Sequence, residues 1–142
     1  MGTVSFTRSI GPYRILCVDD NEIGLFVNAT ILRSQGYDVL TCSDPFRAAE
    51  IANSTEIDVV VLDYQMPLMN GVELAALCRA ANPDIKVILF SGWHEISNLE
   101  LAVVDLFVQK SESPHSLLEG IEALLMADKR IVSDLQMNVR QL

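Results

Sequence analysis

Four apolar runs of this 142-residue chain each end in polar groups that could take part in chemistry. Three clustered carboxylates repel one another and are stable together only with a cation. Carboxylate oxygens are ligands that Mg²⁺ prefers, and a hydroxyl and an ammonium group can hold the oxygens of a phosphoryl group. In chain order, the polar groups are the acid pair Asp19 and Asp20, the single acid Asp63, the hydroxyl of Ser91 and the amine of Lys110.

The four runs that carry these groups have the composition of strands buried on both faces. They are rich in Val, Ile and Leu and do not alternate with polar residues, which is typical of a parallel sheet. Polar groups at the carboxyl ends of such strands converge in one crevice. The sequence therefore predicts one site at the ends of the runs Ile15–Val18, Val59–Leu62, Val87–Phe90 and Leu106–Gln109.

Helical segments alternate with these strands along the chain. Asn21 can cap a first helix, and Ser43-Asp44-Pro45 and Ser113-Pro114 can open two others. This alternation predicts an α/β fold, a flavodoxin-like doubly wound five-stranded parallel sheet of order 2-1-3-4-5 with helices on both faces. We expect strands at about 14–19, 37–42 (an edge strand), 58–63, 85–91 and 104–109, and helices at about 22–35, 45–53, 71–81, 94–102 and from 113 onward.

Length and composition limit the organisation of the chain. We expect one domain at 14–127, a short leader at 1–13, and an extension at 128–142 that is helical or frayed. The balance of 10 basic and 19 acidic residues gives a net charge of −9 without a basic stripe, so we expect no nucleic-acid partner. Three cysteines without CxxC spacing indicate reduced, buried thiols. No apolar run could span a membrane or act as a signal peptide, so we expect a cytoplasmic protein without a membrane partner.

Five separated motifs resemble the receiver (CheY-like) domain of two-component response regulators. Their order along the chain is that of the family, and the resemblance covers about residues 14–127. The motifs are VDDN at 18–21, VVVLDYQMPLMNG at 59–71, LFSG at 89–92, FVQK at 107–110 and SPHSLL at 113–118.

The resemblance implies a role for each group at the strand ends. Asp63 would accept a phosphoryl group from a histidine kinase or phosphotransfer protein. Mg²⁺ would be bound by Asp20, Asp63 and the backbone carbonyl of Gln65, with Asp19 acting through water. Ser91 and Lys110 would hold the phosphoryl oxygens.

The same resemblance implies a switch and an output surface. Ser91 would move toward the phosphoryl group and Phe107 would change rotamer, altering the face made by the fourth helix, fifth strand and fifth helix. Pro67 and Gly71 would shape the loop after Asp63. The family suggests a single-domain response regulator that assists its own phosphorylation and dephosphorylation and is not a dedicated enzyme. A homodimer could form through the output face or through the C-terminal extension.

Three features depart from the family pattern. Ser111 follows Lys110 where the family has proline after a cis peptide; because a non-proline cis bond costs roughly 2.5–4 kcal/mol, we expect a trans bond here. The segment from Ser91 to Lys110 is short, so we expect a truncated or shifted fourth helix. Trp93 and Gln65 are candidates for controlling hydrolysis, although Trp93 could equally be an exposed aromatic residue.

The remaining distinctive residues support weaker hypotheses. His94 and His115 are expected to be solvated. A 4-3 spacing of mostly apolar residues from Leu117 to Leu142 could form a dimer seam, but two polar positions and the short length favour a frayed extension.

Three other functions remain open from the sequence. One is a phosphorylation-independent adaptor on the same fold. Another is a phosphohydrolase of the haloacid-dehalogenase type. That family requires a second Asp two residues after the nucleophile, where this chain has Gln65. The third is a flavin carrier, whose phosphate would be repelled by Asp19 and Asp20.

Overall fold

A computed structural model describes residues 11–92, 96–110 and 115–127. Five parallel strands form one sheet in the order β2-β1-β3-β4-β5, which confirms the topology expected from the sequence. β2 and β5 are the edges and β1, β3 and β4 the centre. The strands are β1 (Arg14–Val18), β2 (Asp38–Cys42), β3 (Val59–Leu62), β4 (Lys86–Ser91) and β5 (Leu106–Gln109).

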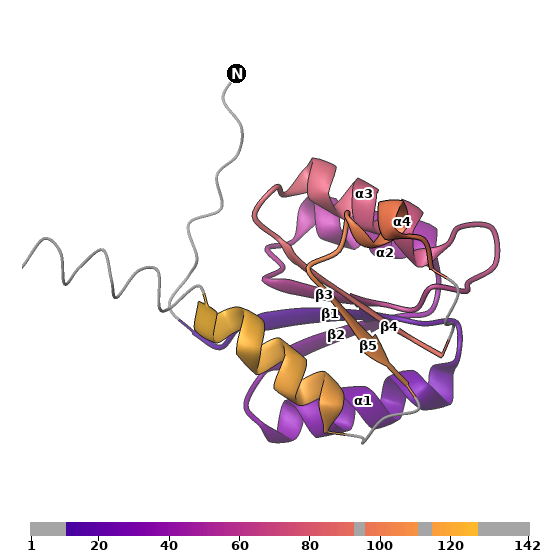
Figure 1. The fold of residues 1–142 in the computed structure, drawn as a ribbon. Coiled ribbons are helices and arrows are strands. Elements are labelled where there is room, and N and C mark those ends of the chain that lie inside the picture. The colour runs from indigo at the N-terminus through magenta and orange to yellow at the C-terminus, as the bar shows by residue number, and fades with distance from the viewer. Residues whose placement is uncertain (1–10, 93–95, 111–114, 128–142) are drawn as a thin grey trace, which may run out of the picture.

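Helices cover both faces of this sheet (Figure 1). α2, α3 and α4 lie on one face, and α1 and the C-terminal helix at 116–127 lie on the other. This arrangement confirms the doubly wound, flavodoxin-like plan. The four labelled helices are α1 (Glu22–Ser34), α2 (Pro45–Ser54), α3 (Gly71–Ala81) and α4 (Asn98–Leu101).

The central strands divide their side chains between two apolar layers. In β1, Leu16 and Val18 face α2 and α3, whereas Ile15 and Cys17 face α1 and the C-terminal helix. All four are buried, as the unbroken apolar runs predicted. β5 is an edge strand and is covered less fully: Val108 is buried, and Leu106 and Phe107 are half-buried against opposite layers, so the expected burial on both faces holds only in part.

Helix caps fix where the helices begin relative to the strand ends. The Oδ1 atom of Asn21 accepts a hydrogen bond from the Gly24 N–H at 3.1 Å, so α1 starts directly after the acid pair. Asp44 caps α2, with Pro45 in the first turn. Asn70 and Glu73 form a reciprocal capping box at the start of α3.

The segment between β4 and β5 contains the main differences from the sequence expectations. α4 has only four residues, which confirms a truncated fourth helix. The strand expected from residue 104 begins instead at Leu106. Val103 and Val104 lie in the turn that follows α4, where their N–H groups donate to carbonyls of α4 at 3.3 and 3.2 Å.

Several sequence expectations fall outside the described residues. They concern Trp93, His94, the Lys110–Ser111 peptide, the cap at 113–114 and the extension at 128–142. Leu117 and Ile121 are described, and both are buried against the sheet. These two residues therefore belong to the domain core, and the frayed extension that the sequence favours lies beyond them, outside the described residues.

Other expectations concern residues that the structure describes. His115 is exposed, as expected. Cys17 and Cys78 are buried and free, whereas Cys42 is free but half-buried. Across residues 11–92, 96–110 and 115–127, no helix combines the length and apolar character needed to cross a bilayer.

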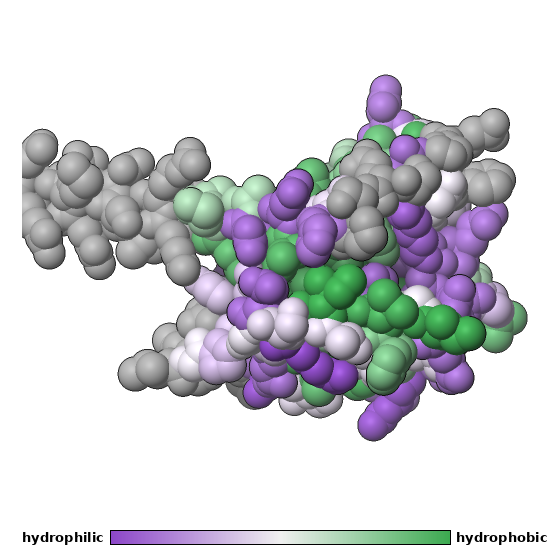
Figure 2. Space-filling model, turned by 90° about the horizontal axis from the view of Figure 1, so that it is seen from below, coloured by the Kyte–Doolittle hydropathy of each residue, from purple (hydrophilic) through white to green (hydrophobic). Residues whose placement is uncertain are grey.

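The face formed by α1 and the C-terminal helix is partly apolar on its outside. Figure 2 shows hydrophobic side chains gathered in a band on this face. On α1, Ile23 is 78% exposed and Phe26 is 70% exposed, and Val27 is also exposed. Uncovered apolar side chains on one helix face indicate a contact surface.

Gly71 allows α3 to begin against the backbone of Asp63. Its N–H donates to the carbonyl of Tyr64 at 2.9 Å. A Cβ atom at this position would lie 2.3 Å from the carbonyl oxygen of Asp63 and 2.9 Å from Cδ1 of Leu89. The backbone at this point cannot move without moving the end of β3.

We therefore predict that Gly71→Ala lowers the free energy of unfolding by about 1–3 kcal/mol, because overpacking forces the chain apart. Gly24→Ala is the matched control: its new Cβ would come no closer than 3.7 Å to Asn21. That variant should be neutral or gain about 0.5–1 kcal/mol from helix propensity. Urea denaturation measures both, and equal effects of the two substitutions would contradict the close contact at Gly71.

Candidate functional site

The three acids meet where β1 and β3 end. The register pairs Val18 with Leu62, and the Asp63 N–H donates to the carbonyl of Val18 at 3.0 Å. The residues that follow the two strands are therefore neighbours. One carboxylate oxygen from each of Asp19, Asp20 and Asp63 lies within 4.8 Å of the others. The convergence predicted from the sequence is confirmed.

The three carboxylates differ in exposure and in bonding. Asp19 is only 5% exposed; its Oδ1 accepts from the Asn21 N–H at 2.9 Å and its Oδ2 accepts from Nζ of Lys110. Asp63 is half-buried and Asp20 is exposed. Because both Asp19 oxygens already accept hydrogen bonds, Asp20 and Asp63 are better placed to bind a cation directly.

Lys110 and Ser91 approach Asp63 from the two strands on its other side. Nζ of Lys110 lies 3.6 Å from Oδ1 of Asp63, and it is held by an ion pair with Asp19. The Lys110 N–H donates to the carbonyl of Ser91 at 3.1 Å, which joins the ends of β4 and β5. Ser91 is buried, and its side chain is hydrogen-bonded to the Asp63 carboxylate.

These contacts set the protonation of Asp63. Burial raises the pKa of Asp63 above its usual value, and the neighbouring charge of Asp19 raises it further. Lys110 and the hydrogen bond from Ser91 act in the opposite direction but do not cancel the rise. The ionised site therefore carries excess negative charge that one lysine does not neutralise.

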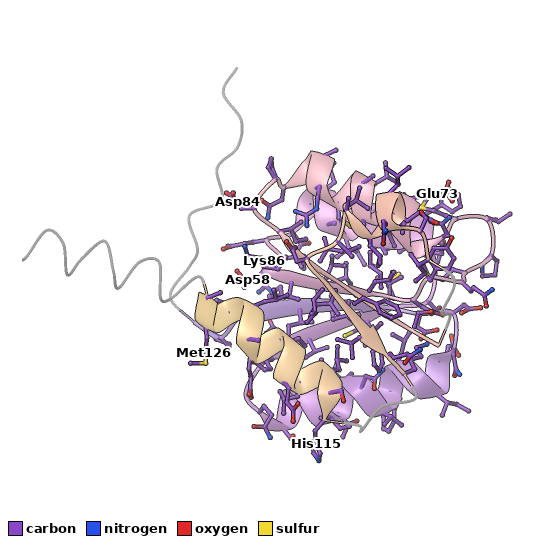
Figure 3. The ribbon with its side chains drawn as sticks, in the orientation of Figure 1. Asp58, Glu73, Asp84, Lys86, His115 and Met126 are labelled. Carbon is purple, nitrogen blue, oxygen red and sulfur yellow. The ribbon has the colours of Figure 1, made fainter. Side chains whose placement is uncertain are left out.

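An open groove of about 440 Å³ lies beside the carboxylates. It is lined by Asp20, Tyr64, Gln65, Met66, Pro67 and Asn70, so most of it comes from the loop between β3 and α3. Figure 3 labels Glu73 next to this loop. It places Asp58, Asp84 and Lys86 at the opposite end of the sheet, where the strands begin. The groove gives a ligand access to the acids from solvent.

This set of donors fits Mg²⁺. The ion favours one or two carboxylates and retains several waters, and Asp20 and Asp63 beside an open groove offer that combination. Gln65 is exposed and lines the same groove, so its carbonyl belongs to the right loop. Its role as a ligand stays a prediction.

The remaining sequence candidates lie near the site or outside the described residues. Phe107 is half-buried on β5, paired with Leu89 of β4, and packs against the layer beneath α2 and α3. Trp93 is outside the described residues. Pro67 is exposed in the loop, where Leu68 adopts φ 70°.

One contact beside the site was not predicted from the sequence. The phenol of Tyr64 donates to Oε2 of Glu100 on α4 at 2.6 Å. The two residues are 36 positions apart, so local patterns do not reveal the pair. Ser97 and Glu100 do form a capping-box pattern that the sequence contains.

The chain is similar to known proteins in sequence and in structure. The family described as "Response regulator receiver domain" matches residues 15–122. The CAI-1 autoinducer sensor kinase/phosphatase CqsS of Vibrio cholerae is 35% identical over 98 residues, which are 64% of this chain and 14% of that protein. The alkaline phosphatase synthesis transcriptional regulatory protein PhoP of Bacillus subtilis is 29% identical over 116 residues, covering 79% of this chain and 48% of PhoP.

A solved structure is also similar over most of the chain. It is the response regulator protein TrrA of Thermotoga maritima in complex with Mg(2+)-BeF. The TM-score is 0.74 at 32% identity, covering 79% of this chain and 98% of that one. The chain spans less than half the length of CqsS and of PhoP, so the likeness to those relatives concerns one part of each.

The raised pKa of Asp63 predicts how pH affects stability without metal. Because the folded carboxyl group binds its proton more tightly than the unfolded one, stability falls as pH rises from about the ordinary value of 3.8 through the folded pKa. Asp63→Asn should therefore raise the free energy of unfolding at pH 7 in the presence of a chelator. The advantage should shrink as the pH approaches 3.

Urea denaturation at the two pH values measures this difference. Asp84 is an exposed acid at the opposite end of the sheet, so Asp84→Asn is the matched control. Its free energy of unfolding should differ little from that of the wild type at either pH. A destabilised Asp63→Asn at neutral pH would contradict the excess negative charge at the site.

Proposed function

Because the chain belongs to the response regulator receiver domain family, we propose that Asp63 accepts a phosphoryl group from a histidine kinase or a phosphotransfer protein. The observation that carries this proposal is the position of Asp63 between two acids and a lysine at the edge of an open groove. The similarity to the sensor kinase CqsS and to TrrA with Mg(2+)-BeF supports the same chemistry.

The proposed reaction transfers the phosphoryl group between a nitrogen and an oxygen. An Asp63 oxygen attacks phosphorus, the P–N bond of a phosphohistidine breaks, and the imidazole leaves with a proton from solvent. Mg²⁺, bound by Asp20, Asp63 and the Gln65 carbonyl and through water by Asp19, would neutralise charge on the transferring oxygens. The chain supplies positioning and charge, so we assign it an acceptor role and not that of a dedicated enzyme.

Lys110 has two tasks in this proposal. Before transfer, its ammonium group lies against Asp19 and near Asp63, where it offsets their repulsion. After transfer, the product carries about −1.5 to −2 charges at pH 7, and the ammonium group can hold its oxygens. The buried Ser91 hydroxyl is the second donor on the same side of Asp63.

The signal would leave the site through a population shift. The phosphoryl group draws the Ser91 hydroxyl away from its contact with the carboxylate, and Phe107 on the neighbouring strand responds. The face made by α4, β5 and the C-terminal helix would then bind a protein partner or a second copy. A ligand shifts this equilibrium only by its differential affinity for the two states.

The apolar outer side of α1 supports a protein as the phosphodonor. α1 begins two residues after Asp20, so the exposed Ile23 and Phe26 lie on the helix that starts at the site. A small phosphodonor would leave these side chains in water. A donor protein that reaches Asp63 across α1 would bury them.

Gln65, exposed in the groove, is placed to limit the approach of water to the product.

Intact-mass measurement tests the proposed function. With Mg²⁺ and phosphoramidate, the wild-type protein should gain the mass of one phosphoryl group, and Asp63→Asn should gain none. A chelator should prevent the gain, because the repulsion at the site is not neutralised without a cation. Asp84→Asn is the control and should be modified like the wild type.

A different result would change the assignment. If rapidly quenched wild-type samples show no adduct, or if Asp63→Asn gains the same mass, Asp63 is not the acceptor. The site would then be a structural ion cluster in a phosphorylation-independent adaptor.

A further inference from the structure

Tyr64 joins the loop after Asp63 to α4. Its backbone carbonyl accepts from the N–H of Gly71, the residue that fits against the Asp63 backbone. Its phenol donates to Oε2 of Glu100 at 2.6 Å in a partly buried position. One residue therefore contacts both the main chain at the site and a helix 36 positions further along the chain.

Glu100 divides its two carboxylate oxygens between Tyr64 and the start of α4. Oε2 accepts from Tyr64, while Oε1 accepts from the N–H and the hydroxyl of Ser97 at 3.4 and 3.1 Å. The Glu100 N–H in turn donates to Oγ of Ser97 at 3.1 Å. Because one carboxylate makes both sets of contacts, hydrogen bonds connect the Tyr64 side chain to the first turn of α4.

α4 depends on such contacts for its position. It has four residues, none of them buried, and a helix of this length is not stable by itself. Leu99 is 87% exposed, so the outer side of α4 contributes little packing. The apolar contacts around it come from Ile96, Val103 and Val104, which share the layer that Tyr64 also packs against.

The Tyr64–Glu100 bond is charge-assisted. The 2.6 Å separation of the phenol oxygen from Oε2 is that of a hydrogen bond to an ionised carboxylate, and this bond lowers the pKa of Glu100. Hydrogen bonds of this type are shorter and stronger than those between neutral groups. The contact can therefore persist under the conditions in which a phosphoryl group would be transferred.

We propose that Tyr64 is a positioning residue that couples occupancy of the Asp63 site to the position of α4 through its hydrogen bond to Glu100. This inference rests on the proposed function, because it needs a ligand at Asp63. It adds a second connection, through the loop between β3 and α3, to the one through Ser91 and Phe107 at the ends of β4 and β5. The coupling is reciprocal, so the position of α4 also affects ligand affinity at the site.

Amide NMR spectra with Mg²⁺ and beryllofluoride, a stable analogue of the phosphoryl group, test the coupling. The amides of Gln65 and Ser91 report occupancy of the site, and those of Asn98 to Leu101 report on α4. In Tyr64→Phe at saturating beryllofluoride, the α4 shifts should fall by roughly twofold or more while the site amides still respond, because one interaction that distinguishes the two states is lost.

Matched variants separate this role from a general loss of structure. Tyr37→Phe removes a phenol hydroxyl beyond the amino end of the sheet and should leave the α4 response at the wild-type value. Glu100→Gln keeps an oxygen that accepts from Tyr64 but removes the charge, so its α4 response should be intermediate. Glu119→Gln, exposed on the C-terminal helix, controls for the lost charge.

The outcomes distinguish the inference from the proposed function. Unchanged α4 shifts in Tyr64→Phe with a saturated site, or a wild-type α4 that does not respond, would overturn the coupling while Asp63 remains the acceptor. Failure of the wild-type protein to bind beryllofluoride would overturn the proposed function and the coupling with it. If Tyr64→Phe does not fold, a wild-type α4 response in Glu100→Gln overturns the coupling in the same way.

Discussion

Asp19 and Asp63 follow adjacent central strands whose register leaves them side by side, partly buried and of like charge. Their repulsion would separate them on a flexible loop. Here the backbone cannot yield, because the Asp63 N–H bonds to β1 and Gly71 packs on the Asp63 carbonyl. The ion pair of Lys110 with Asp19 offsets only part of the charge, because one ammonium group faces three carboxylates and lies 3.6 Å from Asp63. The other groups at the carboxyl ends of the strands surround two carboxylates whose repulsion is only partly offset.

Rigid elements hold the charged groups, and less tightly held ones surround them. β3 is buried throughout and β1 is buried from Ile15 to Val18, and Asn21 and Asn70 cap α1 and α3 at the site. The loop between β3 and α3 and the short α4 are more exposed and are joined by Tyr64 and Glu100. A ligand that removes the repulsion at Asp63 would therefore first move this loop and α4, which have the least packing.

Most of the fold and the site could be predicted from local sequence patterns. The apolar runs located the central strands to within a residue or two, and the polar residue after each run identified the site. The bounds expected for α3, 71–81, are those observed, because its caps and helical periodicity agree. Such segments are predictable because propensity, capping and burial all favour the same structure.

The exceptions depend on contacts between distant residues. Val103 and Val104 are β-branched and resemble a strand, but Nε of Arg79 donates to the Val103 carbonyl at 2.9 Å. Oδ2 of Asp105 accepts hydrogen bonds from Arg79 and from the Val87 N–H, both at 2.7 Å. These contacts hold Asp105 before the strand, so β5 begins at Leu106. The Tyr64–Glu100 bond is of the same kind. No period or motif within a short window encodes these pairs.

The response of folding stability to Mg²⁺ tests most directly whether the acids form a site completed by a cation. For the wild-type protein, the free energy of unfolding should rise with Mg²⁺, by about 2.7 kcal/mol at one hundred times the dissociation constant. Asp63→Asn should lose most of this gain, since it removes both a ligand and the repulsion. Equal Mg²⁺ responses in the two proteins, or none in the wild type, would contradict the account.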